Sequence, residues 1–289
     1  MVDYIGRFAP SPTGHLHLGS LVAAVGSYVR AKNRNGQWLV RMEDLDPLRE
    51  ESEAKVSILQ DLERHGLHWD GDVEFQSQRQ SYYEAALDAL KDQDLVYPCY
   101  CSRKFLIATA ERGEFGMIYP GHCRNGAEAT KAPSIRVRTH NDPLCFNDLT
   151  CGELCQRLES ALGDFIVKRS DGYIAYQLAV VVDDHGQGIT EVVRGADLLG
   201  NTPRQIHLQQ LLGYETPEYF HLPLMMNDQG QKLSKQTHAP GLEKGKEIAN
   251  LEQVLRFLAF DIGKDESWGS VDELLIFAVK NSPDWLLAR

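Results

Sequence analysis

Long hydrophobic runs are absent from this sequence of 289 residues. No apolar stretch approaches the ~20 residues that a membrane-spanning helix needs. The first residues, Met-Val-Asp-Tyr-Ile-Gly-Arg, also lack the apolar core of a secretory signal peptide. Neither internal repeats nor low-complexity segments occur. We therefore expect a cytoplasmic protein with no membrane partner.

Positive charge is scarce relative to negative charge. The sequence has 30 Lys and Arg against 41 Asp and Glu, which gives a formal net charge of -11. A protein that depends on non-specific binding to nucleic acid would be basic, so this class is excluded. One shaped site with a local basic patch remains compatible with the acidic total. Such a patch, or else an ordinary solvated surface, is formed by Arg103, Lys104, Arg112 and Arg124.

Cysteine is also uncommon. The six cysteines are scattered, as expected for a protein of the reducing cytosol and not for a disulfide framework. Cys145, Cys151 and Cys155 have no matching set of ligands and are predicted to be buried thiols. The remaining composition, with 43% hydrophobic and 25% charged residues, is ordinary for a globular protein. The length is ample for a sizeable core in one large domain or two.

Strand and helix patterns alternate over the first part of the chain. Apolar residues repeat at helical spacing at Val56, Leu59 and Leu62. The patterns predict strands over 2–8 and 38–42, and helices over 21–32, 50–65 and 81–95. Strands that alternate with helices favour a parallel sheet with crossover helices.

The alternation breaks at residue 97 and resumes near residue 166. Residues 97–165 contain all the cysteines, several Gly and Pro and one short predicted strand over 134–138, and we interpret them as an insertion. The apolar run 176–182 is typical of a central parallel strand. Residues 202–212 are expected to form a helix with Thr202 as N-cap and Pro203 at its first position. With a helical tail from Glu247 onward, we expect four segments, 1–96, 97–165, 166–240 and 241–289.

The most informative segment is Ser11-Pro12-Thr13-Gly14-His15-Leu16-His17-Leu18-Gly19-Ser20. It joins a predicted strand to a predicted helix, and such a junction directs backbone N–H groups and the positive end of the helix dipole at one spot, which suits a phosphate. His17 can donate to a phosphate oxygen, and Gly19 leaves room for a base or ribose. A Pro- and Gly-rich turn with surface histidines is the alternative, because a single Gly-rich turn is a weak signal.

A second polar segment, Gln231-Lys232-Leu233-Ser234-Lys235-Gln236, lies far downstream between Gly230 and Pro240. Two lysines that flank a serine on such a loop can close over a triphosphate. With both segments present, the chain resembles the class I aminoacyl-tRNA synthetases. Their signature His-Ile-Gly-His is matched by His17-Leu18-Gly19-Ser20, and Lys-Met-Ser-Lys-Ser is matched by Lys232-Leu233-Ser234-Lys235-Gln236.

Three further motifs narrow the resemblance to the glutamyl branch of this family. They are Arg7-Phe8-Ala9-Pro10-Ser11-Pro12-Thr13-Gly14, Arg41-Met42-Glu43-Asp44-Leu45-Asp46 and Val193-Arg194-Gly195-Ala196-Asp197-Leu198-Leu199. The motifs stand in the right order over residues 7–236. The resemblance implies an α/β fold with a Rossmann-type doubly wound parallel sheet, a zinc-bearing insertion and a small helical region at the end.

The reaction that the resemblance implies is activation of L-glutamate by ATP. The family assigns catalysis to His17, Lys232 and Lys235, which would neutralise charge on the reacting phosphate. ATP binding is assigned to His17, Gly19, Ser20 and Lys235. Ser20 replaces the second histidine of the signature, and a hydroxyl donates a hydrogen bond but carries no positive charge. Mg²⁺ is expected with ATP, although no carboxylate cluster in the sequence is a clear metal cage.

Recognition of glutamate needs cations for two carboxylates and an acceptor for the ammonium group. By resemblance, Arg7 and Arg194 bind the carboxylates, since an arginine fork suits a carboxylate best. Which arginine meets the side-chain carboxylate stays open. The other expected pocket residues are Ala9, Ser11, Glu43 as ammonium acceptor, and Tyr176. Each residue alone also has an ordinary structural interpretation, and the turn residues Asp44, Asp46 and Arg49 are expected to shape the loop instead of touching substrate.

Three thiols in the insertion form a candidate metal site. Cys99-Tyr100-Cys101 and Tyr119-Pro120-Gly121-His122-Cys123 offer them together with two other possible ligands. Zinc usually takes four ligands, and the ordinary choice for the fourth is His122. The tRNA-modifying glutamyl enzymes instead pair three cysteines with a tyrosine four residues before the last. The resemblance thus implies a structural Zn²⁺ on Cys99, Cys101, Tyr119 and Cys123, with His122 and free thiols as the alternatives.

The chain is most similar in pattern to the family of glutamyl-queuosine tRNA(Asp) synthetases. Only 53 residues follow Gln236 (289 − 236), too few for the usual helical anticodon-binding domain of a glutamyl-tRNA synthetase. This family joins glutamate to queuosine at the wobble position of the tRNA(Asp) anticodon. The cyclopentene diol of queuosine has a hydroxyl that can attack an acyl-adenylate as a ribose hydroxyl does. The expected partners are ATP, L-glutamate and tRNA(Asp) carrying queuosine, and the chain is expected to be a monomer.

Three other functions stay open at this point. A truncated glutamyl-tRNA synthetase would charge the 3′ end of tRNA(Glu). A non-catalytic paralogue would only bind glutamate or a nucleotide, and the retained His17, Lys235, Glu43 and two arginines count against it. A nucleotidyltransferase of the same fold would act on a small molecule, and the arginine pair and the insertion count against that function.

Overall fold

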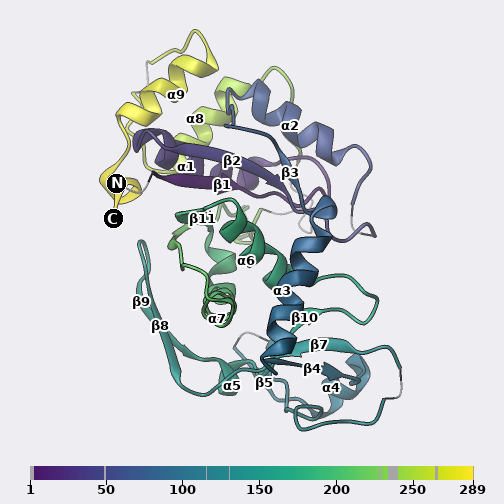
Figure 1. Ribbon diagram of the computed structural model, residues 1–289. Helices are drawn as coiled ribbons and strands as arrows, with labels where there is room; N and C mark the ends of the chain where they lie inside the picture. The colour runs from purple at the N-terminus through teal and green to yellow at the C-terminus, as the bar shows by residue number, and fades with distance from the viewer. Residues whose placement is uncertain are drawn as a thin grey trace.

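The architecture comes from a computed structural model, which describes residues 3–48, 50–114, 116–129, 131–227, 229–233, 240–263 and 266–288. Figure 1 shows a parallel sheet with helices α8, α9 and α2 above it and helices α6 and α7 below it. A small strand-rich unit lies at the far end. No helix in the described ranges is both long and apolar enough to cross a membrane.

The first half of the sheet follows the expected alternation. Strands β1 (Ile5–Phe8), β2 (Gln37–Met42) and β3 (Glu74–Phe75) pair in parallel. Helix α1 (Leu18–Asn33) joins β1 to β2, and helix α2 (Ala54–Arg64) lies between β2 and β3. The short turn η1 (Gln76–Gln78) and helix α3 (Gln80–Asp92) follow. The predicted strands and helices of this region are confirmed, with ends that shift by a few residues.

The second half of the sheet is built from strands that lie further along the chain. Strand β11 (Glu191–Gly195) pairs in parallel with β12 (Glu218–Leu222), which pairs in turn with β8 (Pro143–Asp148). Strand β11 packs beside β1, where Thr190 N donates to Ile5 O at 2.9 Å. The carboxyl ends of β1 and β11 therefore lie close together, which brings Arg7 near Arg194.

The prediction of a central strand over 176–182 was wrong. The segment forms helix α6 (Tyr176–Gly186). Leu178 to Val182 are at most 5% exposed, because α6 is enclosed by α3, α7 (Thr202–Leu212) and β10 (Phe165–Lys168). A helix that is buried on all sides has no polar face, so its sequence cannot be distinguished from a buried strand by periodicity.

Helix α7 is confirmed, but its predicted cap is wrong. The turn η2 (Ala196–Asn201) leads into it, and the N-cap is Asn201. Thr202 already has helical dihedral angles, φ -54° and ψ -47°, and its hydroxyl accepts a hydrogen bond from Arg194. The helix ends at Gly213 in the left-handed conformation, φ 69°, which glycine adopts without strain.

The insertion has its own antiparallel sheet, in the order β10-β7-β4. It contains β4 (Val96–Cys99), β7 (Ser134–Val137), the short hairpin β5 (Arg112–Gly113) and β6 (Gly116–Met117), and the helices α4 (Arg103–Thr109) and α5 (Leu158–Ala161). The predicted strand over 134–138 is confirmed. The expected boundaries at residues 96, 165 and 240 stay a prediction, although β8, which lies within 97–165, pairs with the sheet of the core.

The prediction of three buried thiols at Cys145, Cys151 and Cys155 was wrong. Strand β8 forms a hairpin with β9 (Gly152–Arg157), and its register places Cys145 opposite Cys155. The two form a disulfide, while Cys151 in the turn is exposed. Pairing register is fixed by the turn and the facing strand, so linear cysteine spacing did not reveal it.

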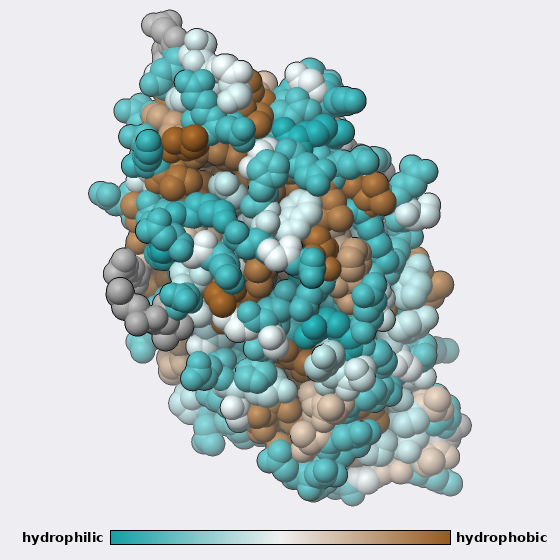
Figure 2. All heavy atoms as spheres, turned by 45° about the horizontal axis from the view of Figure 1, so that its top comes forward, coloured by the Kyte–Doolittle hydropathy of each residue, from teal (hydrophilic) through white to brown (hydrophobic). Residues whose placement is uncertain are grey.

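The helical tail covers α1. It consists of α8 (Glu247–Phe257), α9 (Val271–Lys280) and the turn η4 (Asp284–Leu287), and α8 and α9 both pack on α1. The expected helical region is thus confirmed. One core cluster joins α1, β1, β2 and this tail, and a second joins α3, α6 and the insertion sheet. In Figure 2 hydrophilic residues cover most of the visible face, and the apolar residues form separate groups.

Candidate active site

The loop after β1 forms the start of α1 around His17. His17 is the N-cap, and its Nδ1 accepts a hydrogen bond from Ser20 N at 3.2 Å. Ser20 Oγ accepts from His17 N at 2.8 Å, which completes a capping box. Because Nδ1 is an acceptor, the proton of the neutral ring sits on Nε2, which can donate to a ligand oxygen. Ser20 therefore helps to fix the position of His17, a role that the sequence did not reveal.

A cavity of about 730 Å³ unites the two signature segments. Its walls include His17, Gly19, Ser20, Lys232 and Ala9. Lys232 donates to Asp197 Oδ2 at 2.5 Å, which holds the lysine at the edge of the cavity. Lys235, the other lysine of the segment, lies outside the described residues, as do Ser234, Gln236 and the turn residue Arg49. A nucleoside triphosphate fits this volume and its cationic edge.

Gly19 is packed closely against the His17 ring and the second signature segment in this cavity. A Cβ built there lies 3.0 Å from Leu233 O and 3.1 Å from the His17 ring. We expect Gly19→Ala to displace His17 and to lower kcat/KM for ATP in ATP–pyrophosphate exchange by at least about tenfold, since small misplacements of a catalytic group are costly. Gly269→Ala, whose Cβ meets Glu273 Oε2 at 3.3 Å before α9, is a matched control outside the cavity. An unaltered exchange rate in Gly19→Ala would contradict this role of Gly19.

A second cavity of about 540 Å³ adjoins the first, and both share Ala9, Ser11, Thr13 and Leu198 in their walls. Glu43 and Tyr176 line this second cavity. Four of the six residues expected to bind glutamate, Ala9, Ser11, Glu43 and Tyr176, therefore meet here. Arg7 and Arg194 are not among its lining residues and are buried, at 3% and 5% exposure.

A buried ion network holds Arg7. Arg7 donates from Nε to Asp184 Oδ1 at 3.0 Å and from Nη2 to Oδ2 at 3.2 Å. Arg41 Nη2 donates to the same Asp184 Oδ1 at 2.8 Å. The two guanidinium groups hold the pKa of Asp184 below its usual range, against the opposing effect of burial. Asp184 therefore fixes the Nε and Nη2 edge of Arg7, while Nη1 lies 3.5 Å from Val193 O.

Arg194 is oriented by neutral partners from neighbouring elements. Its Nη1 donates to Gln205 Oε1 at 2.7 Å, its Nη2 to Thr202 Oγ1 at 2.7 Å and its Nε to His221 Nε2 at 3.0 Å. These residues were missed by sequence reasoning, because β12 and α7 only meet β11 in the folded chain. Three of five N–H donors are used by these bonds, so two remain for a carboxylate.

The His221 side chain, which accepts from Arg194, also contacts Asp148 on strand β8. Its Nδ1 lies 2.5 Å from Asp148 Oδ2, and both side chains are fully buried. Burial lowers the pKa of His221, and since Nε2 accepts from Arg194, Nδ1 donates its proton to the aspartate. Asp148, His221 and Arg194 thereby form a chain across β8, β12 and β11 that fixes the guanidinium plane.

Glu43 is a carboxylate of the second cavity that interacts with Arg41 and Arg7. Burial raises its pKa to about 7, a change enlarged by Asp184 and Asp183 and opposed by Arg41 and Arg7. Arg41 Nη2 lies 3.6 Å from Glu43 Oε1. The neighbouring Asp44 accepts from Ser77 and Lys55 and therefore shapes the loop, as expected.

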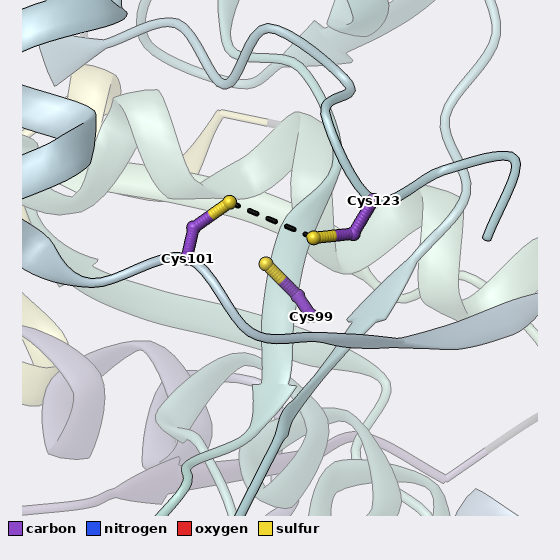
Figure 3. Close-up of side chains that lie close together, drawn as sticks. All are labelled: Cys99, Cys101 and Cys123. Atoms are coloured by element: carbon purple, nitrogen blue, oxygen red, sulfur yellow. Dashed lines mark hydrogen bonds between the residues drawn. The ribbon is translucent and has the colours of Figure 1, made fainter. Parts of the chain in front are cut away.

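The three cysteines of the insertion converge, as Figure 3 shows. Cys99 and Cys101 flank the end of β4 and Cys123 comes from the facing loop, and their Sγ atoms lie within 4.8 Å of one another. Cys101 Sγ and Cys123 Sγ are 3.6 Å apart. Tetrahedral zinc with Zn–S bonds of about 2.3 Å places sulfurs about 3.8 Å apart, so the thiols fit this ion.

The Tyr119 hydroxyl completes the cluster geometrically. It lies 3.4 Å from Cys99 Sγ and 3.9 Å from Cys101 Sγ, close to the about 3.5 Å that a shared zinc would impose on sulfur and oxygen ligands. His122 is not part of the described metal-ligand cluster, and its ring packs against Phe105 at 4.9 Å. The geometry therefore agrees with Tyr119 better than with His122.

The contacts of Arg136 with Tyr119 and Cys99 were not predicted from the sequence. The Arg136 guanidinium lies 3.8 Å from the centre of the Tyr119 ring, and its Nε donates to Cys99 Sγ at 3.3 Å. Gly163, at φ 69°, lets its own backbone pass close to that of Tyr119, because a Cβ there would come within 2.3 Å of Tyr119 O. A positive charge beside three thiolates offsets the net negative charge of a zinc centre with three sulfurs.

The four basic residues proposed as a patch do not act as one group. Arg124 donates to Asp164 Oδ1 at 2.6 Å and so belongs to the structure of the insertion. Arg103 and Lys104 are exposed at the start of α4, and Arg112 is exposed on β5. The exposure of these three residues supports the alternative interpretation, an ordinary solvated surface.

Comparison with known proteins identifies the family of this chain. The family model for the catalytic domain of class I tRNA synthetases (E and Q) matches residues 5–254. A relative from Thiobacillus denitrificans named glutamyl-Q tRNA(Asp) synthetase is 56% identical over 275 residues, which are 95% of this chain and 91% of the relative. The relative of the same name from Shigella flexneri is 50% identical over 285 residues, 99% of this chain and 90% of the relative.

Solved structures show the same fold. A glutamate tRNA ligase from Elizabethkingia meningosepticum, in complex with its amino acid, matches with a TM-score of 0.78 and 23% identity. The match covers 99% of this chain and 66% of that ligase. The family model and the relatives at 50–56% identity show that this chain belongs to the glutamyl-Q tRNA(Asp) synthetase family of class I synthetases.

Proposed function

We propose that this chain is a ligase that activates L-glutamate with ATP and transfers the glutamyl group to queuosine at the wobble position of the tRNA(Asp) anticodon. The observation that carries this function is the pair of adjoining cavities that share Ala9, Ser11 and Thr13. A triphosphate in the larger cavity and an amino acid in the smaller one meet at this junction, where adenylation takes place. The similarity to relatives of that name supports the RNA substrate.

Each side chain has a role in this reaction. His17 Nε2–H and Lys232 bind phosphate oxygens and offset the charge that develops on them. Lys235 is proposed for the same role on the strength of its motif. Arg7 and Arg194 bind the carboxylates, Glu43 accepts from the ammonium group, and Ser11 and Tyr176 donate hydrogen bonds. Mg²⁺ bound with ATP would add positive charge at the phosphates.

The cysteine cluster would serve as a structural metal centre. Cys99, Cys101, Tyr119 and Cys123 fit Zn²⁺ by distance and by ligand chemistry. All four lie in the insertion, away from the two cavities, so this ion would fix the fold of residues 97–125 and take no part in the chemical steps.

The ionisation of Glu43 makes glutamate binding depend on pH. Because burial raises its pKa to about 7, Glu43 is mostly protonated below that pH and then cannot pair with an ammonium group. We expect the KM for glutamate to rise about tenfold between pH 8 and pH 6 in ATP–pyrophosphate exchange. In Glu43→Gln the KM should be high throughout and flat with pH. A wild-type KM that stays constant over this interval would remove Glu43 as the ammonium acceptor.

The function is tested by transfer of labelled glutamate with ATP. The acceptors are tRNA(Asp) with queuosine, tRNA(Asp) without it and tRNA(Glu), and nuclease digestion then locates the label. Label in the anticodon fragment of queuosine-bearing tRNA(Asp) alone is the expected result. Label at the 3′ end of tRNA(Glu) would make the chain a short aminoacyl-tRNA synthetase. Labelled adenylate with no labelled RNA would instead favour a small-molecule acceptor. The absence of both labelled adenylate and labelled RNA would favour a binding protein.

A further inference from the structure

One arginine at the junction of core and insertion lacks an ionic partner in the described ranges. Arg204, on α7, is half-buried, and its Nη2 donates only to Gly200 O at 3.3 Å. Its Nε is buried and has no hydrogen-bond partner. Burial lowers the pKa of Arg204, and no carboxylate offsets this effect. A desolvated cation without a counter-charge is costly for a folded chain, and such a group requires a functional explanation.

The other buried arginines of the described chain each have at least two hydrogen-bond acceptors, although Arg41 Nε also lacks one. Arg7 and Arg41 share Asp184, and Arg30 donates to both oxygens of Glu191. Arg194 has three side-chain acceptors. Arg204 has a single backbone acceptor at 3.3 Å and is therefore the least satisfied of these arginines, which suggests that its partner arrives with a ligand.

Arg204 lines a cavity of about 340 Å³ between α7 and the insertion. The opposite wall is largely apolar, formed by Leu106, Met117, Leu162, Phe165 and Ile166. The lining also includes Arg136, which donates to Cys99 Sγ and Asp164 O, and Asp164, whose carboxylate accepts from Tyr97, Arg124 and Thr139. Both of these charged groups already have partners, so the charge available to a ligand is that of Arg204. An apolar wall beside such a cation suits a ligand that has a flat, weakly polar body and an anionic group.

The cavity and the glutamate pocket lie on two sides of the first turn of α6. Tyr176 lines the glutamate pocket, while the next residue, Gln177, lines the Arg204 cavity. Gln177 donates to Asn201 Oδ1 at 2.7 Å, and Asn201 also lines the glutamate pocket. A ligand beside Arg204 therefore lies next to the position where the glutamyl group is transferred.

We propose that this cavity binds a nucleotide that flanks the acceptor nucleotide of the RNA, with its phosphate on Arg204 and its base against the apolar wall. The inference rests on the proposed function, because it gives the third substrate a place. ATP and glutamate already have cavities of their own. Single-stranded RNA is recognised through splayed bases on apolar surfaces and through phosphate contacts from arginine, which matches the two features of this cavity.

The test compares Arg204→Gln with wild type and with Lys280→Gln, which removes one exposed charge from the end of α9 at the opposite end of the molecule (Figure 1). The probe is the queuosine-bearing tRNA(Asp) anticodon stem-loop, titrated at several salt concentrations. For Arg204→Gln we expect about tenfold weaker binding and a salt slope reduced by about 0.7 to 1, the change for one lost phosphate contact. ATP–pyrophosphate exchange with glutamate should be unaltered. Lys280→Gln should match wild type in both measurements.

A second variant tests the apolar wall without altering charge. Met117→Trp fills part of the cavity, and we expect weaker RNA binding with the wild-type salt slope. Thermal stability checks that each variant is folded, and Arg204→Gln should lose none, because it removes an uncompensated cation.

Three results would overturn the proposal: RNA affinity and salt slope equal to wild type in Arg204→Gln, an equal loss in Lys280→Gln, or a raised KM for glutamate that accounts for the whole effect. Failure of the proposed function is a separate outcome. If wild type glutamylates tRNA(Glu) instead, the same titrations with tRNA(Glu) decide the role of Arg204, and if wild type binds neither RNA, both proposals are wrong.

Discussion

Replacing Arg194 with glutamine is expected to raise the KM for glutamate by about a hundredfold. Hydrogen bonds to a charged group contribute about 1.5–3 kcal/mol each, and a loss of about 2.7 kcal/mol corresponds to a hundredfold change. The guanidinium is pre-oriented by Thr202, Gln205 and His221, so the wild-type chain spends little free energy on ordering it. Arg194→Lys keeps the charge but loses the planar fork, and its KM should lie between the two.

The measurement is ATP–pyrophosphate exchange at increasing glutamate concentrations. Arg64→Gln, which removes an arginine paired with Asp61 and Glu247 away from both cavities, is the control and should keep the wild-type KM. The KM for ATP should change little in Arg194→Gln, because the two substrates occupy different cavities. Equal increases in both KM values together with a lower melting temperature would show a general loss of structure, and an unaltered glutamate KM would place the carboxylate site elsewhere.

The sequence predicted the parts of this site that depend on local chain geometry. The segment around His17 follows a strand and begins a helix, and this junction fixes its position without help from distant residues. The Glu43 loop is similar, since it directly follows β2. In both cases the motif and the local element determine the side-chain position, so a linear pattern was sufficient.

The partners of these residues depend on tertiary contacts and could not be predicted. Asp184 lies on α6, a segment misassigned as a strand because it is apolar and buried on every side. His221 and Asp148 reach Arg194 only because β12 pairs with both β8 and β11. The disulfide of Cys145 and Cys155 depends on hairpin register in the same way. Pairing between distant strands leaves no periodic signal in a single sequence.

The second large effect concerns the cysteine cluster. We expect Cys101→Ser to abolish stable zinc binding, so that metal analysis after dialysis finds about one zinc per wild-type chain and almost none in the variant, since a structural site needs all its ligands. Cys151→Ser is the matched control, because Cys151 is exposed in the β8–β9 turn. Tyr119→Phe should lower zinc affinity, whereas His122→Ala should not. The reverse order would make His122 the fourth ligand.

Loss of the metal should also loosen the insertion. The apolar cluster around the site is small, with Tyr97, Cys99, Tyr119 and Cys123 as its buried members. So few buried contacts cannot hold the segment by themselves, and metal binding then supplies part of its folding free energy. Limited proteolysis of Cys101→Ser should therefore cut within residues 97–125, and ATP–pyrophosphate exchange should persist because both cavities lie in the core. Full zinc occupancy in Cys101→Ser, or equal protease resistance without zinc, would show that the cluster holds the insertion through its own packing.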